Sequence, residues 1–239
     1  MIPSLEVDVT WTRSEIFARD PDAACARELL SPLEREALDR LRPASARTDY
    51  LAAHALTRVL LAERMELHPV EVPIRASPGQ KPELAPLQSV SPQSAPRLRF
   101  SLSHADGIAL CALVPVQAIG ADVESLRNLD DDVPGIASVF CSEREQRALA
   151  KERADQRASR LLGIWTLKEA MAKACGLGFR LDFRRITLRP TPYWELLSLR
   201  LTPFHTAAVA VRRTPGTPVA FSVVELASGL GGRWIRPSS

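Results

Sequence analysis

Two carboxylates lie two positions apart in an apolar segment of the chain, IGADVE (119–124). In a β-strand alternate side chains share a face, so Gly120, Asp122 and Glu124 point one way while the apolar residues point the other. The two carboxylates are then roughly 7 Å apart at Cα, and each raises the pKa of the other unless a cation neutralises them. Mg²⁺ favours a couple of carboxylates together with substrate phosphates. The spacing therefore indicates a magnesium site, with a solvent-facing polar strand as the alternative.

A second segment, WTLKEAMAKACG (165–176), combines a carboxylate with two lysines. On a helix, Trp165, Glu169 and Lys173 share one stripe at steps of four residues. Glu169 is then a candidate third metal ligand or base, and Lys168 and Lys173 can bind phosphates. The alternative is a surface ion pair between Glu169 and Lys173, worth ~0.3–0.5 kcal/mol. Only four of the 31 Lys and Arg residues are lysines, which adds some weight to the functional interpretation.

Two shorter segments contribute further polar groups. FSLSH (100–104) carries hydroxyls and an imidazole, which can donate hydrogen bonds or titrate near neutral pH. GQKP (79–82) predicts a turn that presents Lys81. Each segment alone is common in structural roles. The two segments support a functional site only because both precede the acidic strand in this order.

These residues must be positioned by the helices and strands that the sequence predicts along the chain. Helical periodicity and capping signals predict helices over 21–42, 45–66 and 159–175, and another that begins at Ser142. Alternating or continuous apolar runs predict strands at 5–11, 100–104, 108–114, 118–124, 186–190, 194–201, 207–213 and 219–226. Residues 77–96, rich in Pro, Ser and Gln, are expected to form a surface loop.

The composition is that of an ordinary globular enzyme, with 46% apolar and 25% charged residues. No run reaches the ~18 apolar residues of a spanning helix, and the first residues lack the features of a signal peptide. We therefore expect a cytoplasmic protein that does not bind membranes. The net charge of +3 is too small to indicate nucleic acid as a partner. Four widely spaced cysteines are expected to be reduced core thiols: Cys25, Cys111, Cys141 and Cys175.

Taken together and in order, QKP, FSLSH, IGADVE and WTLKEAMAKACGLG resemble the motifs of the 4′-phosphopantetheinyl transferases. The similarity is greater to the longer, single-chain type that activates peptide and polyketide synthetases, and it covers about 47–188. The resemblance implies a mixed α+β fold of two similar, pseudo-twofold-related halves, 1–117 and 118–239. A short internal similarity between HADGIALCA (104–112) and HTAAVAV (205–211) also suggests two halves. The resemblance places the active site in the cleft between them, which would let a monomer build the whole site.

The resemblance also implies a role for individual residues. Asp122, Glu124 and Glu169 are expected to hold Mg²⁺, and Lys168 and Lys173 to lie near the pyrophosphate of coenzyme A, the co-substrate. The residues expected to contact the phosphates of the nucleotide are Arg47, Lys81, Ser103 and His104. Members of the family often carry several arginines on the first long helix. This chain has Arg47 and Arg58 there, but Asp49 and His54 stand at positions where arginines are common.

The implied reaction is attack by a serine hydroxyl of an apo acyl or peptidyl carrier protein on the β-phosphate of coenzyme A, which releases 3′,5′-ADP. Mg²⁺ and the lysines, Lys173 among them, would neutralise charge on the pyrophosphate. Glu169 would take the serine proton, directly or through water. One alternative is a metal-dependent nuclease, which would not explain FSLSH and QKP. A second is a non-catalytic descendant that binds a carrier protein or an anion.

Overall fold

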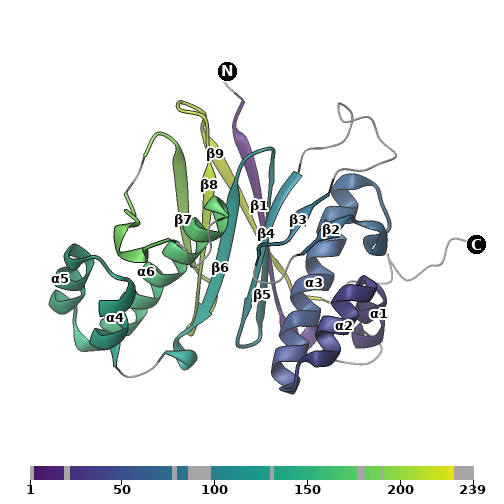
Figure 1. Ribbon diagram of the computed structural model, residues 1–239, viewed down its shortest axis with the longest axis horizontal. Helices are drawn as coiled ribbons and strands as arrows, with labels where there is room; N and C mark the ends of the chain where they lie inside the picture. Colours follow the sequence, from purple (N-terminus) through teal and green to yellow (C-terminus); the bar gives the residue numbers. More distant parts are fainter. Residues whose placement is uncertain are drawn as a thin grey trace, which may run out of the picture.

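Two β-sheets pack face to face at the centre of the molecule, with helices on their outer faces (Figure 1). The structure is a computed structural model that describes residues 3–18, 22–76, 80–85, 98–129, 132–176, 181–189 and 191–228. Its helices are α1 (Asp22–Glu28), α2 (Pro32–Arg40), α3 (Ala44–Met65), α4 (Val133–Phe140), α5 (Glu143–Lys151) and α6 (Ala154–Cys175). Its strands are β1 (Leu5–Arg13), β2 (Ile74–Arg75), β3 (Glu83–Leu84), β4 (Leu98–Ala105), β5 (Ile108–Pro115), β6 (Ile119–Ser125), β7 (Trp194–Arg200), β8 (His205–Arg212) and β9 (Val219–Leu226).

The two larger sheets repeat one topology. The first has the order β4-β5-β1-β9 and the second β6-β8-β7, with β2 and β3 forming a separate pair. In each half a strand is followed by a long helix and then by an antiparallel pair of strands, whose second member lies in the middle. The corresponding helices, α3 and α6, both have 22 residues. The predicted mixed α+β fold of two similar halves is therefore confirmed. The last strand, β9, crosses over to the first sheet, where it pairs in parallel with β1.

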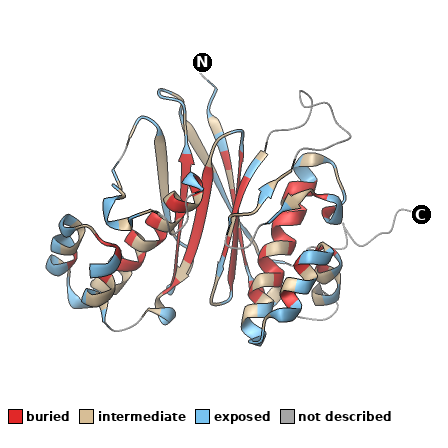
Figure 2. Ribbon diagram, in the orientation of Figure 1, coloured by how far each residue is buried: buried red, intermediate tan, exposed pale blue. Residues whose placement is uncertain are grey.

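The core between the sheets comes from alternate residues of the strands that face each other. Ile119, Ala121 and Val123 of β6 pack with apolar side chains of β1, β5 and β8. Separate apolar clusters lie beneath α3 and beneath α6. Figure 2 shows this pattern as buried residues along the central strands and along the inner faces of both long helices. The face of β6 that is left over, with Gly120, Asp122 and Glu124, is turned toward α6.

Several predicted elements differ from the structure for local reasons. The expected helix 21–42 is two helices, because Ser31 caps α2 and Pro32 occupies its first turn. Helix α4 lies in a segment for which no helix was predicted, and residues 186–189 form no strand. Parts of the predicted loop 77–96 lie outside the described residues. The short internal similarity, between residues 104–112 and 205–211, does not align structurally equivalent histidines. His104 lies near the end of β4, whereas His205 is the first residue of β8.

The cysteines are all free, but they are not all core residues. Cys111 and Cys141 are buried, whereas Cys25 is half-buried and Cys175 is exposed at the end of α6. The prediction of four core thiols is therefore wrong for two of them. Among the described helices, none has the length and apolar character needed to cross a membrane.

Candidate active site

The three predicted acidic residues lie on facing surfaces of β6 and α6. Asp122 is buried, with 4% of its surface exposed, and Glu124 and Glu169 are half-buried. Strand alternation places Asp122 and Glu124 on the helix side of β6, and the stripe of α6 that carries Trp165 and Glu169 meets them there. The interpretation of β6 as a solvent-facing polar strand is therefore wrong.

Gly120 allows the close approach of α6 to β6. A Cβ atom at this position would lie 1.9 Å from the carbonyl oxygen of Ala170 and 2.5 Å from the amide nitrogen of Ala174. Both are backbone atoms of α6, so a side chain could be accommodated only by moving the helix. The absence of a side chain at Gly120 thus sets the distance between the acidic strand and Glu169.

We expect Gly120→Ala to lower about a hundredfold the transferase activity that the resemblance implies, because small displacements of catalytic groups have effects of that size. Overpacking should also lower the free energy of unfolding by about 1–3 kcal/mol. Steady-state kinetics and thermal unfolding would measure both effects. The matched control is Gly163→Ala on α6, where an added Cβ meets nothing within 4 Å and should stabilise the helix slightly. Equal activity in the two variants would contradict the role of Gly120.

Lys173 and Ser103 bind one oxygen of Asp122. The Lys173 ammonium donates to Asp122 Oδ1 at 2.8 Å and to Ser103 Oγ at 3.1 Å. The Ser103 hydroxyl in turn donates to Asp122 Oδ1 at 3.0 Å. Ser103 comes from β4 of the first half, whereas Lys173 and Asp122 come from the second. The ion pair of Lys173 is therefore with the buried acidic strand, and the interpretation of Glu169 and Lys173 as a surface pair is wrong.

Two carboxylate oxygens of this site are buried without a hydrogen-bond partner, Asp122 Oδ2 and Glu169 Oε1. Burial raises the pKa of Glu169 to about 7; the charge of Asp122 adds to this effect and that of Lys173 opposes it. Burial and the charge of Asp122 also raise the pKa of Glu124. Buried, unpaired carboxylate oxygens are costly unless a cation satisfies them. Carboxylate oxygens suit Mg²⁺, which usually takes one or two of them together with water and substrate phosphates.

These carboxylates do not form a complete metal cage. Among the residues that the structure describes, no group of three or more His, Cys, Asp or Glu side chains is arranged so that it could hold a metal ion. A Mg²⁺ ion typically takes several ligands from water and from substrate phosphates. The acidic residues are thus suited to an ion that arrives with, or is completed by, a phosphate-bearing substrate.

The open edge of β6 brings a second lysine to the site. Ser101 Oγ accepts a hydrogen bond from the Ala121 amide at 2.9 Å, and Lys173 donates to the Ala121 carbonyl at 3.1 Å. The Lys81 ammonium donates to the carbonyl of Ile119 on the same edge. Burial lowers the pKa of Lys81 to about 8, and the charge of Lys173 contributes to that shift. Lys81, Lys173 and Ser103 therefore gather where the first half meets the acidic strand.

Lys168 lies on a different face of α6 and does not reach this site. Its side chain is fully buried, and its ammonium donates to Glu145 Oε2 at 2.6 Å, to Phe140 O at 3.0 Å and to Phe183 O at 2.9 Å. A lysine ammonium has three donors, and all of them are used. These contacts tie α6 to the segments around it and do not support the expectation that Lys168 lies near the pyrophosphate.

Two predicted nucleotide contacts lie apart from the carboxylates. His104 is exposed and one position beyond Ser103, so strand alternation turns it toward the α3 side of β4. Arg47, in the first turns of α3, is exposed and donates to the carbonyls of Leu41 and Arg42. Neither residue contacts the acidic residues, so any role for them concerns another part of the ligand.

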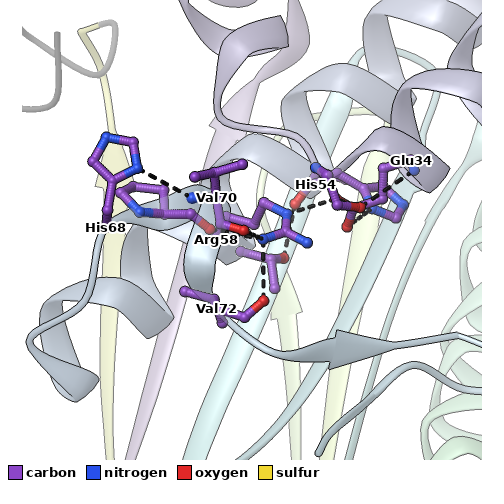
Figure 3. Close-up of polar contacts among 10 residues, drawn as sticks. Glu34, His54, Arg58, His68, Val70 and Val72 are labelled. Carbon is purple, nitrogen blue, oxygen red and sulfur yellow. Dashed lines mark hydrogen bonds and ion pairs between the residues drawn. The ribbon is translucent and has the colours of Figure 1, made fainter. Parts of the chain in front are cut away.

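Arg58 forms a buried network inside the first half (Figure 3). Its Nε donates to Glu34 Oε2 at 2.5 Å, and its Nη1 donates to carbonyls of the segment 69–72. The imidazole of His54 lies 3.1 Å from the other oxygen of Glu34. Arg58 is 1% exposed and therefore serves the fold rather than a phosphate. By holding residues 69–72, it also anchors the segment that leads to β2 and Lys81.

We expect Glu34→Gln to destabilise the protein at neutral pH and to do so less as the pH falls. Burial alone would raise the pKa of Glu34, but His54 and Arg58 lower it to about 2. Because the pKa of Glu34 is lower in the folded protein, its carboxylate stabilises the fold at pH values above about 4.5, the pKa of an ordinary glutamate. This contribution is lost as the pH falls toward 2. Urea unfolding of both proteins between pH 7 and pH 3 would test this. The exposed Glu36→Gln is the control, and a constant difference for Glu34→Gln at all pH values would contradict the network.

An apolar cavity of about 280 Å³ adjoins the acidic residues. Its lining consists of Glu124, Ser125, Asn128, Leu129, Ile136, Phe140, Leu162 and Trp165. The indole Nε1 of Trp165 donates to Glu124 Oε1 at 3.2 Å, so the cavity wall touches the acidic site directly. The stripe of Trp165, Glu169 and Lys173 is visible in the sequence, but the hydrogen bond from Trp165 to the strand is not.

Comparison with known proteins gives a consistent result. The family model of the 4′-phosphopantetheinyl transferase superfamily matches residues 118–214. The 4′-phosphopantetheinyl transferase HetI of Nostoc sp. is 32% identical over 174 residues, which cover 69% of this chain and 71% of that protein. A mouse (Mus musculus) L-aminoadipate-semialdehyde dehydrogenase-phosphopantetheinyl transferase is 23% identical over 91% of this chain and 78% of its own length. A holo-(acyl-carrier-protein) synthase of Sulfurovum sp. is 28% identical over 45% of this chain but 95% of its own length.

The chain belongs to the 4′-phosphopantetheinyl transferase superfamily. The predicted class of enzyme and its reaction, transfer of phosphopantetheine from coenzyme A to a carrier protein, are thereby confirmed. The matched region 118–214 contains the acidic strand, α6 and the lysine that binds Asp122.

Proposed function

We propose that Asp122, Glu124 and Glu169 hold a Mg²⁺ ion that the transfer of phosphopantetheine requires. The observation that carries this proposal is a pair of buried carboxylate oxygens without a partner, on Asp122 of β6 and Glu169 of α6, close enough for the charge of Asp122 to raise the pKa of Glu169. When bound, Mg²⁺ would neutralise negative charge on the pyrophosphate of coenzyme A and orient it. The open coordination of the site agrees with an ion that shares its ligands with substrate phosphates.

Lys173 and Lys81 are the cations that we assign to the phosphates of coenzyme A. Both ammonium groups lie along the open edge of β6, within reach of the strand's carbonyls. In a partly buried site an ammonium group attracts a phosphate more strongly than it does in water. Ser103 supports this arrangement because it links Lys173 to Asp122. His104 and Arg47 stay predictions for the nucleotide end of the ligand.

Glu169 is the group that we propose to accept the proton of the attacking serine. A base works best when its pKa is near the working pH, and burial raises the pKa of Glu169 to about 7. We assign its Oε1, which is buried and has no protein partner, to the ion. Because a carboxylate has two oxygens, one can face the ion while the other faces the hydroxyl.

The apolar cavity beside Glu124 is suited to the pantetheine arm. It begins at an acidic residue of the proposed metal site and continues between Ile136, Phe140 and Leu162. An arm seated there would place its phosphate end at the carboxylates and exclude water from the reacting centre. The macromolecular substrate in this proposal is an apo acyl or peptidyl carrier protein that presents its serine at the same opening.

We also propose that the enzyme is active as a monomer with halves at 1–117 and 118–239. One chain contributes both sides of the site, since Ser103 and Lys81 precede the boundary and Asp122 and Lys173 follow it. Light scattering of the active enzyme would test the monomer. A dimer at assay concentrations would contradict it.

The proposed function can be tested with the purified protein, coenzyme A and a panel of apo carrier proteins. Intact-mass spectrometry should show a carrier heavier by one phosphopantetheine group when Mg²⁺ is present and no change after treatment with EDTA. Restoring Mg²⁺ to the treated sample should restore the transfer. Equal transfer with and without the chelator would contradict the metal assignment, and an unmodified carrier throughout the panel would support a non-catalytic descendant.

A further inference from the structure

The indole of Trp165 is held in one orientation by the residues around it. Its ring meets the ring of Phe140 edge-on, with centroids 4.5 Å apart and planes at 74°. It also stacks on Phe183, with centroids 6.0 Å apart and planes at 6°. Aromatic contacts of this geometry stabilise a fixed ring. The direction of the indole N–H is therefore determined by packing that does not involve the substrate.

That fixed N–H points at a carboxylate of the acidic strand. Nε1 of Trp165 donates to Oε1 of Glu124 at 3.2 Å across the gap between α6 and β6. The terminal torsion of a glutamate side chain is soft, so a free carboxylate samples many orientations. A donor bound to one oxygen restricts this rotation and leaves the second oxygen in a defined direction.

The packing around Trp165 has its own support. Lys168, about one turn further along the same helix, donates to the backbone carbonyls of Phe140 and Phe183, the two residues whose rings hold the indole. A continuous set of contacts thus runs from the buried Lys168–Glu145 pair through the two phenylalanines to Trp165 and Glu124. Lys168 thus supports the residues that pack against Trp165.

We propose that Trp165 is a positioning residue that orients Glu124 for the metal through its indole N–H. The inference rests on the proposed function, because it assumes that Glu124 is a metal ligand. Residues that hydrogen-bond to metal ligands typically contribute 10–100-fold to metal affinity. Packing alone would not require a tryptophan here. Trp194, by comparison, packs against Ala170 and Ala174 of the same helix.

The test is Mn²⁺ binding in the presence of coenzyme A, followed by electron paramagnetic resonance, for the unchanged protein and for Trp165→Phe. Phenylalanine keeps an aromatic ring between Phe140 and Phe183 but removes the N–H. We expect the dissociation constant for Mn²⁺ to rise about tenfold. The metal concentration that gives half-maximal transfer should rise in parallel, while kcat at saturating metal recovers. Trp194→Phe is the matched control and should leave both quantities unchanged.

Replacement of Trp165 by 3-benzothienylalanine, which has sulfur in place of the N–H on a ring of nearly the same shape, provides a second variant. If Trp165→Phe does not fold, this variant decides the question in the same assay. Mn²⁺ affinity equal to that of the unchanged protein in a folded variant would overturn the inference. Asp122→Ala separates this result from failure of the proposed function. Should the unchanged protein itself bind Mn²⁺ no better than Asp122→Ala, both the metal site and the role of Trp165 would be rejected.

Discussion

Replacement of Asp122 by alanine is expected to lower the rate of phosphopantetheine transfer by roughly 10³-fold or more. Loss of metal-bound charge stabilisation costs several kcal/mol, and each 1.36 kcal/mol corresponds to a factor of ten. The fold should persist, because Lys173 keeps the Ser103 hydroxyl and the Ala121 carbonyl as partners, and the carboxylate that is removed is buried with one unpaired oxygen. Removing such a group relieves a desolvation cost, and residues of this kind commonly reduce stability in exchange for function.

The measurement combines intact-mass kinetics on an apo carrier protein with thermal unfolding and Mn²⁺ binding. Glu169→Gln should lose transfer to a similar degree, since glutamine retains the shape but neither the charge nor the basic oxygen. Glu143→Gln is the matched control, because Glu143 lies on α5 with 87% of its side chain exposed. Near-normal turnover in either Asp122→Ala or Glu169→Gln would show that the metal assignment is wrong.

Replacement of Lys168 by methionine is expected to have the largest effect on stability. The variant leaves Glu145 without its ammonium partner and leaves the carbonyls of Phe140 and Phe183 without a donor. Breaking a buried ion pair by removing one partner typically costs about 3–5 kcal/mol. In a chain of 239 residues this corresponds to a decrease in Tm of roughly 10 °C.

Differential scanning fluorimetry and CoA-dependent kinetics would test this assignment together. Lys151→Met, at an exposed position on α5, is the control and should unfold like the unchanged protein. If Lys168 instead binds the pyrophosphate, Lys168→Met would keep its Tm and raise the KM for coenzyme A. That outcome would restore the expectation drawn from the sequence and contradict the structural role.

The local patterns that predicted the acidic site are those with a fixed geometric period. Alternation along a strand requires Asp122 and Glu124 to share a face with Gly120. Steps of four on a helix require Trp165, Glu169 and Lys173 to share a stripe. These relations hold in the structure because they depend only on the backbone of one element.

Relations between elements were not predictable in the same way. Neighbouring residues on a helix point about 100° apart, so either Lys168 or Lys173 could have faced the acidic strand. The choice follows from the docking of α6 on β6, which Gly120 permits and which turns Lys168 toward Glu145. Arg58 shows the same limit in the first half, because a buried Glu34 on a different helix takes its guanidinium.

The sequence by itself therefore indicated the chemistry of the site: three carboxylates, a lysine in the same helical stripe, and a resemblance to a family whose substrate is coenzyme A. Only the tertiary structure decided which lysines serve that site, which serve the fold, and that the Trp165 N–H reaches Glu124. The physical reason is that side-chain periods are set by local backbone geometry. Contacts between α6, β6 and β4 depend instead on packing between segments up to 70 residues apart along the chain.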